Sequence, residues 1–371
     1  MKIETIAIHA GNKTDNASGA VIQPIVLSTT FERAADGSFP SGYIYSRAAN
    51  PNRTLLENVL AKLESGADAA SFSSGNAAGM AVFQSLKPGT HIILPDDMYH
   101  GLRNQLKFLF AGILEFDFID VNNSEVLQQH LKPNTGLIWV ETPSNPLLKI
   151  ADIKKVIAIA KQHKIKVACD NTFATPIFQQ PLVLGADIVM HSCTKYFGGH
   201  SDLMGGVLIT ATKDDWWAKI RQVQEMGGAI PSPMECYMLA RSIKTLPYRM
   251  AGHAKNAQLL AEYLQKHPKI EQVMYPGLPN HPQYDIAKQQ MTGFGAMMSI
   301  CLKGGEAEAK RVVNSLKLFT QATSLGGVES LIEHRASVEG PDTKTPFNLL
   351  RISVGLEHID DLIEDFEQAL K

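Results

Sequence analysis

One lysine in this sequence is placed as a reactive amine. Lys195 follows an apolar stretch at 188–190, and two hydroxyl residues, Ser192 and Thr194, precede it, while a pair of glycines follows. A lysine amine is nucleophilic only without its proton, and burial favours that neutral form by lowering the pKa. Short hydroxyl side chains can hold a phosphate, and glycines permit a sharp turn. The spacing therefore allows an imine-forming lysine, and a solvated surface lysine is the alternative that it leaves open.

An acid and a possible anion-binding turn follow two other strand-like stretches. Asp170 comes directly after the apolar stretch 166–169, where a carboxylate could keep a pyridine nitrogen protonated. Ser74, Gly75 and Asn76 stand between a predicted strand and a predicted helix. Free N–H groups and the helix dipole at such a turn can bind a phosphate. An N-capping aspartate and a plain turn remain the alternatives for these two features.

Strand-like and helical patterns alternate from about residue 53 to 210, which predicts a mainly parallel sheet with helices on both faces. In such sheets the ligand lies beyond the carboxyl ends of the strands, where the residues above are placed. After about residue 245 the pattern of predicted helices and strands changes to that of a smaller α+β domain. Residues 1–47 indicate an extended arm. The expected strands are 69–72, 91–94, 137–140, 166–169, 188–190, 296–302 and 349–354, and the expected helices are 53–64, 76–86, 153–163, 251–267, 307–316 and 360–370.

Composition excludes several classes of protein. The 371 residues are 44% apolar and 19% charged, which is typical of a globular chain with two domains. A net charge of −2 without a basic block argues against nucleic acid as a partner. No apolar run predicts a membrane span or a secretory signal, and the four dispersed cysteines predict neither disulfides nor a metal site. We therefore expect a cytoplasmic protein. The absence of GxGxxG after the first strand argues against a nicotinamide dehydrogenase.

Together these stretches closely resemble the Cys/Met-metabolism family of pyridoxal-5′-phosphate (PLP) enzymes, which includes cystathionine γ-synthase and the cystathionine β- and γ-lyases. The resemblance runs from Thr5 to Glu357, and the lysine motif from Asp187 to Ser201 is matched in full. It implies an α/β fold of PLP-dependent fold type I, similar to aspartate aminotransferase, with a mainly parallel seven-stranded sheet flanked by helices and a smaller α+β C-terminal domain. The implied divisions are an arm (1–47) that reaches the neighbouring subunit, a PLP-binding domain (48–245) and a C-terminal domain (246–371).

The resemblance also implies roles for individual residues in a homotetramer, a dimer of dimers with shared active sites. Lys195 would hold PLP as a Schiff base, Asp170 would pair with the ring nitrogen, and Tyr99 would stack on the ring and serve as a candidate acid. Arg351 would clamp the substrate α-carboxylate with its guanidinium fork. The other implied contacts are Ser74, Gly75, Asn76, Ser192 and Thr194 to the phosphate, Tyr45 and Arg47 to the neighbouring subunit's PLP, and Asn145, Ser324, Glu333 and Arg103 to the substrate.

This sequence departs from the family pattern near the substrate. Gly101 stands where methionine γ-lyases carry a cysteine, which disfavours that activity. Ala48 stands where synthases that use acylated homoserine often carry a second arginine, for which Arg103 is the candidate substitute. Glu333 resembles the acid that receives the distal amino group of cystathionine in γ-type enzymes. The following His-Arg-Ala-Ser-Val-Glu-Gly stretch, which includes Arg335, replaces the frequent His-Pro-Ala-Ser-Met-Thr-His.

The resemblance implies an enzyme that cleaves the C–S bond of a cystathionine-type amino acid by β- or γ-elimination. Its substrate would be a small sulfur amino acid. The alternative within the family is cystathionine γ-synthase, which carries out γ-replacement on an O-acylhomoserine with cysteine. A non-catalytic PLP-binding regulatory protein belongs to a different class, and the intact set of Tyr99, Asp170, Lys195 and Arg351 argues against it.

Overall fold

Seven strands form the larger sheet of the computed structural model, which describes residues 1–11, 14–339, 343 and 345–371. They are β1 (Asp68–Phe72), β2 (His91–Pro95), β3 (Glu115–Ile119), β4 (Thr135–Glu141), β5 (Lys166–Asp170), β6 (Ile188–Ser192) and β7 (Gly206–Thr210). Their order across the sheet is β1-β7-β6-β5-β4-β2-β3. Neighbouring strands run parallel except at β7, which is antiparallel to both β1 and β6. The predicted mainly parallel seven-stranded sheet is confirmed.

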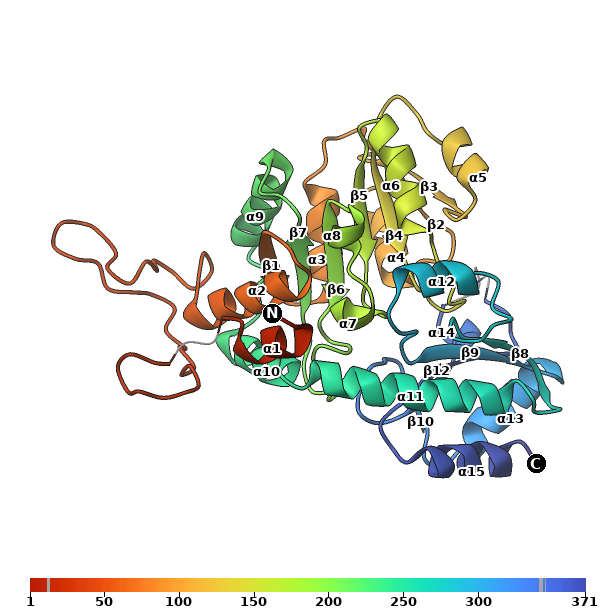
Figure 1. Cartoon of the computed structure of the whole chain (residues 1–371). Coiled ribbons are helices and arrows are strands. Elements are labelled where there is room, and N and C mark those ends of the chain that lie inside the picture. Colours follow the sequence, from red (N-terminus) through yellow and green to blue (C-terminus); the bar gives the residue numbers. More distant parts are fainter. Residues whose placement is uncertain (12–13, 340–342, 344) are drawn as a thin grey trace.

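Helices cover both faces of this sheet (Figure 1). They are α2 (Pro51–Leu63), α3 (Gly75–Gln84), α4 (His100–Leu109), α5 (Ser124–Gln129), α6 (Ile153–Gln162), α7 (Thr175–Phe178), α8 (Pro181–Leu184), α9 (Asp215–Gly227) and α10 (Pro233–Ile243). Alternate strand side chains point to opposite faces. In β4, Leu137 and Trp139 belong to one buried cluster, with residues of α3, α4 and α9, whereas Ile138 and Val140 belong to another, with residues of α2, α6 and α8. Apolar burial on both faces explains the nearly continuous hydrophobic strands.

A second, five-stranded sheet follows the long helix α11 (Leu246–Leu264). Its order is β10-β11-β12-β9-β8, antiparallel except for the β10–β11 pair. The strands are β8 (Ile270–Met274), β9 (Met297–Leu302), β10 (Thr320–Gln321), β11 (Leu331–His334) and β12 (Leu349–Ser353), and the helices are α12 (Tyr284–Gln290), α13 (Gly305–Ser315), α14 (Ala336–Glu339) and α15 (Ile359–Ala369). This is the smaller α+β part that the sequence predicted, while the exact divisions at 47/48 and 245/246 stay predictions.

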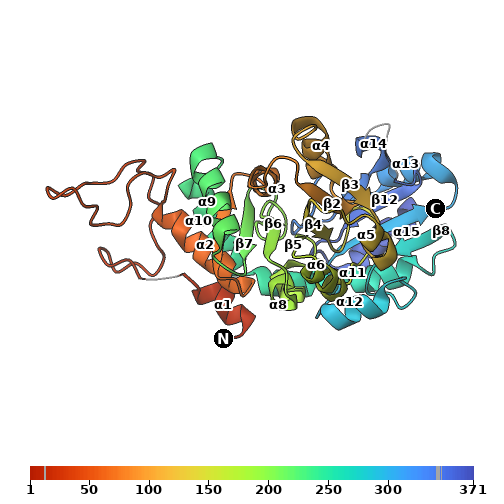
Figure 2. The same cartoon turned by 90° about the horizontal axis from the view of Figure 1, so that it is seen from above.

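The N-terminal segment differs in part from the extended arm that we expected. Residues 3–9 form a helix, α1 (Ile3–His9), which contacts α2 and α11. The helical spacing is carried by four apolar residues, Ile3, Ile6, Ala7 and Ala10, and it places the two buried alanines against the core. This pattern is short, and the polar residues around it hid the helix from the sequence analysis. Beyond this helix the chain projects from the body in long loops (Figures 1 and 2). That part matches the predicted arm in shape.

The strand ends collect polar residues at one edge of the large sheet. β4 ends at Glu141, β5 at Asp170 and β6 at Ser192, and the register pairs Glu141 directly with Asp170. These are the carboxyl ends at which open α/β sheets place their ligands. None of the helices in the described part of the chain combines the length and the apolar composition that crossing a bilayer requires.

Candidate active site

A cavity of about 500 Å³ opens at these strand ends, between the large sheet and the C-terminal part of the chain. Its volume lies within the range of small-molecule sites. The predicted site residues that line it are Ser74, Gly75, Asn76, Tyr99, Asn145, Asp170, Ser192, Thr194, Lys195, Ser324 and Arg351. The structure therefore brings together residues that are as many as 277 positions apart, from Ser74 to Arg351.

Lys195 lies just after β6, where its amine enters the cavity. Its Nζ donates a hydrogen bond to the hydroxyl of Ser324 at 2.9 Å. Burial lowers the pKa of Lys195 to about 8, and the positive charges of Arg351 and Arg335 add to this effect. A lysine in this state is a far better nucleophile and base at neutral pH than an exposed one.

Ser324 connects the lysine to the candidate carboxylate clamp. Its hydroxyl accepts from Lys195, and its backbone carbonyl accepts from Nη2 of Arg351 at 3.0 Å. Its φ of 145° is unusual for a residue with a side chain and is the kind of backbone strain that occurs at functional sites. Arg351 also donates through Nη1 to Oδ1 of Asn145 at 3.2 Å and through Nη2 to Oε2 of Glu333 at 2.8 Å. Two of the five N–H groups of its guanidinium remain for a ligand.

Asp170 and Glu141 form a pair of buried carboxyl groups on the opposite wall. Thr172 donates to Oδ1 of Asp170 through its backbone N–H at 3.0 Å and its hydroxyl at 2.5 Å, which leaves Oδ2 for a ligand. Burial raises the pKa of Asp170 in spite of these bonds. Burial and the charge of Asp170 raise the pKa of Glu141 well above its usual range. A bound cation at Asp170 would relieve this shortage of positive charge.

A phosphate-sized cradle lies at the N-terminus of α3. Ser74 caps the helix by accepting the N–H of Ala77 at 3.1 Å, and the first helical N–H groups belong to Gly75 and Asn76. A Cβ on Gly75 would stand 2.9 Å from the Cβ of Ser192, so glycine keeps the cradle open. From the other side, Gly206 packs so tightly that a Cβ there would stand 2.2 Å from the carbonyl oxygen of Ser74.

Comparisons with known proteins agree with this geometry. The family model described as Cys/Met metabolism PLP-dependent enzyme matches residues 4–371. The chain belongs to this family. It is 45% identical to a cystathionine gamma-lyase of Dictyostelium discoideum (100% of this chain, 97% of the relative) and 44% identical to a cystathionine gamma-synthase of Mycobacterium leprae (99% and 96%). The crystal structure of metB from Corynebacterium glutamicum superposes with a TM-score of 0.97 at 43% identity, covering 100% of this chain and 98% of that one.

The residues of the cavity fit the family cofactor, PLP. The cradle at α3, with Ser192 and Thr194 beside it, suits a phosphate dianion. The buried amine of Lys195 suits the aldehyde, and the carboxyl group of Asp170 suits a protonated ring nitrogen. This protein is therefore a PLP-dependent enzyme of the lyase or transferase type that acts in sulfur amino acid metabolism.

Tyr99 stands immediately before α4 and lines the cavity. Its backbone N–H donates to Oε2 of Glu141 at 2.8 Å, so the buried carboxyl holds the start of this helix in place. Its ring lies 4.8 Å from that of His100, centre to centre. Burial raises the pKa of the Tyr99 phenol, which therefore keeps its proton at neutral pH.

Four predicted site residues do not line the cavity. Arg103 faces an adjacent cavity, where it donates to the backbone carbonyl of Asp96 and stacks on Phe118. Glu333 lies behind the cavity wall and pairs with Arg351 and Arg335. Tyr45 and Arg47 lie on the arm, where Nη1 of Arg47 donates to the carbonyl of Glu225 at 2.9 Å. Their expected contact with a neighbouring subunit stays a prediction.

Of the residues that the structure describes, eleven others line the cavity without having been predicted as site residues, and three of them bear on its chemistry. Thr172 orients Asp170, and its place two residues after the acid is the kind of local hydrogen-bonding pattern that sequence can suggest. His100 and Arg335 line the substrate side. The signal for Arg335 was the departure from the family pattern in the stretch after Glu333, which marked the region without assigning a role.

We expect Gly206→Ala to weaken PLP binding about tenfold, because the new methyl group must push Ser74 and the phosphate cradle out of place, at a cost of about 1–3 kcal/mol. Gly227→Ala is the matched control, since a Cβ at Gly227 has no neighbour within 4 Å. Titration of the two apoenzymes with PLP, followed by fluorescence, measures the difference. Equal affinities would show that Gly206 does not set the cradle.

The lowered pKa of Lys195 has a direct signature in the apoenzyme. The rate at which a small neutral reagent acylates Lys195, followed by peptide mass spectrometry, should reach half its maximum near pH 8. An ordinary lysine reaches that point near pH 10.4. Because the folded pKa lies below the unfolded one, this group also makes the apoenzyme more stable as pH rises from about 8 towards 10.4. A midpoint above pH 10 would contradict the geometry.

Proposed function

We propose that this chain is a cystathionine-type carbon–sulfur lyase, which cleaves its substrate by β- or γ-elimination. The observation that carries the proposal is the continuous chain of contacts from Lys195 through Ser324 to Arg351 in one cavity with Asp170 on its other wall. An amine base, a carboxylate clamp and an acid for the cofactor ring are the parts that α-proton removal from an amino acid requires.

Each part has a task at a stated atom. PLP, when bound, supplies a protonated ring that stores the electron pair released at the substrate Cα. The free N–H groups of Arg351 bind the α-carboxylate, helped by the amide of Asn145 beside them. Asp170 holds the proton of the ring nitrogen through its carboxylate. The phosphate cradle at Gly75 and Asn76 fixes the cofactor at the other end.

Proton transfer falls to Lys195 and Tyr99. With a pKa of about 8, Nζ of Lys195 can take the proton from Cα near neutral pH and return it to a neighbouring atom. The departing sulfur needs a proton, and either Tyr99 Oη or Lys195 Nζ can give it. Both groups line the same cavity, and the raised pKa of Tyr99 keeps its hydroxyl protonated.

The proposal includes a homotetramer in which arms are exchanged between neighbouring subunits. The projecting arm bears Tyr45, which is 46% exposed, and Arg47, whose guanidinium lies 5.9 Å from the ring of Tyr45. Neither lines the cavity of its own chain. An arginine and a tyrosine presented in this way suit a phosphate in an adjacent subunit.

Cystathionine γ-synthase is the second candidate. The expected sign of γ-type chemistry was Glu333 as the acceptor of a distal ammonium, but its Oε2 accepts from both Arg351 and Arg335 at 2.8 Å. Thr323 donates to its other oxygen. With its oxygens so occupied, Glu333 no longer favours γ-type over β-type chemistry, and the two guanidinium groups beside it suit a synthase that uses an anionic acylated homoserine.

Product analysis separates the candidates. With cystathionine alone, we expect cysteine and 2-oxobutyrate from γ-elimination or homocysteine and pyruvate from β-elimination. Lys195→Ala should lower the rate by about 10²–10⁴-fold, the range for a lost general base, while Lys107→Ala on the exposed face of α4 should leave it unchanged. If turnover requires cysteine and acylated homoserine together, the protein is a synthase; no turnover with any sulfur amino acid overturns both candidates.

A further inference from the structure

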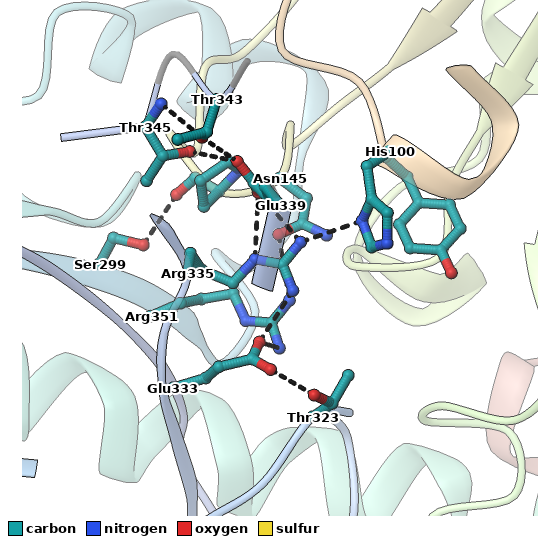
Figure 3. Close-up of polar contacts among 12 residues, drawn as sticks. His100, Asn145, Ser299, Thr323, Glu333, Arg335, Glu339, Thr343, Thr345 and Arg351 are labelled. Carbon is teal, nitrogen blue, oxygen red and sulfur yellow. Dashed lines mark hydrogen bonds and ion pairs between the residues drawn. The ribbon is translucent and has the colours of Figure 1, made fainter. Parts of the chain in front are cut away.

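Arg335 is a buried cation at the substrate side of the cavity, directly after β11, and only 1% of its surface is exposed. Figure 3 shows its guanidinium between two carboxylates and an imidazole. Nη1 donates to Oε2 of Glu333 at 2.8 Å, Nε and Nη2 donate to Oε1 of Glu339 at 3.2 and 3.0 Å, and Nη2 also meets Nδ1 of His100 at 3.2 Å. Of the five N–H groups, one on Nη1 remains.

The contact with Arg335 fixes the tautomer of His100. A guanidinium can only donate, so Nδ1 of His100 must accept, and the ring carries its proton on Nε2. Burial lowers the pKa of His100, and the charge of Arg335 lowers it further, so the ring stays neutral. His100 lines both this cavity and the adjacent one, and with Nδ1 occupied its Nε2–H is the donor that the ring can offer to a ligand.

Two guanidinium groups line this end of the cavity, one more than an α-carboxylate needs, and the two acids behind them balance their charge. Arg351 and Arg335 both line the cavity, whereas their partners Glu333 and Glu339 do not. Thr323 donates to Glu333, and Thr345 donates to Glu339 at 2.6 Å, so both acids are held in place behind the guanidinium groups (Figure 3). A substrate at this end therefore meets N–H donors of two guanidinium groups, and neither Glu333 nor Glu339 lines the cavity to receive a distal ammonium.

We propose that Arg335 and the Nε2–H of His100 form a second anion-binding subsite, which selects amino acids whose side chain ends in a negatively charged group. The inference rests on the proposed function in one respect, since Arg351 is assigned the α-carboxylate. The fitting class is a dicarboxylic amino acid, with the side chain joined through a thioether or an ester. Methionine and uncharged esters such as O-acetylhomoserine leave the one free N–H of Arg335 and the Nε2–H of His100 without a partner.

Equilibrium binding to the holoenzyme tests this subsite without turnover. The probes are adipate and hexanoate, which have the same six-carbon length and differ in the second carboxylate. We expect calorimetry to show adipate binding tighter than hexanoate by about tenfold or more, the range for charged hydrogen bonds. Arg335→Met and His100→Leu should reduce this ratio to near one, while Arg335→Lys should retain part of it. Arg311→Met, which changes an exposed arginine on α13, should leave it intact.

His100 is only partly buried, so His100→Leu keeps the test valid should Arg335→Met fail to fold because of the two acids left unpaired. Equal affinities for the two probes in the unaltered enzyme, or an unchanged ratio in both His100→Leu and a folded Arg335 variant, would overturn the subsite. Failure of the proposed function is a separate result: the adipate preference would be present, but cystathionine would give no keto acid. If the enzyme cleaved cystathionine but did not prefer adipate over hexanoate, only the proposed subsite would be contradicted.

Discussion

The hydrogen bond from Lys195 to Ser324 is the contact on which the site depends. It joins the end of β6 in the large sheet to the segment that precedes β11 in the smaller one. The amine is buried only because these two parts close over it, and burial is the main reason that its pKa falls to about 8. If the parts separated, the lysine would regain water and its proton. Arg351 and Ser324 belong to the same part and would move away together, so Arg351 would lose its bond to Asn145.

Charges are distributed unequally between the two walls of the cavity. The large-sheet wall holds Asp170 and Glu141, whose pKa values are raised by burial. The opposite wall holds Arg351 and Arg335, and burial lowers the pKa of Arg351 to about 10. A cofactor with a cationic ring nitrogen and a substrate with carboxylates complement this arrangement. The polarity of the cavity thus orients both ligands before any chemistry begins.

Sequence predicted well what local patterns determine. The strands before Asp170 and Ser192 were apolar and short, and their polar ends met at one edge as parallel topology requires. The expected helix 153–163 is α6, and Asp152 directly before it accepts the N–H of Lys155 as its N-cap. β7 was not among the expected strands, so its antiparallel course was not predicted either.

Contacts between distant segments could not be predicted in the same way. Glu333 was expected to face a substrate ammonium. Instead it pairs with Arg335, at the end of β11, and with Arg351, which belongs to β12. The contact between His100 and Arg335 joins positions 235 residues apart. No periodicity or spacing encodes such a pair, since it depends on how the two sheets pack together.

The central claim is that the amine of Lys195 binds an aldehyde cofactor whose ring nitrogen is supported by Asp170. Borohydride reduction of the purified enzyme, followed by peptide mass spectrometry, tests it most directly. The account predicts a yellow protein that loses its colour and carries a single pyridoxyl phosphate adduct on Lys195. A protein that stays colourless with added PLP and gives no lysine adduct would contradict it.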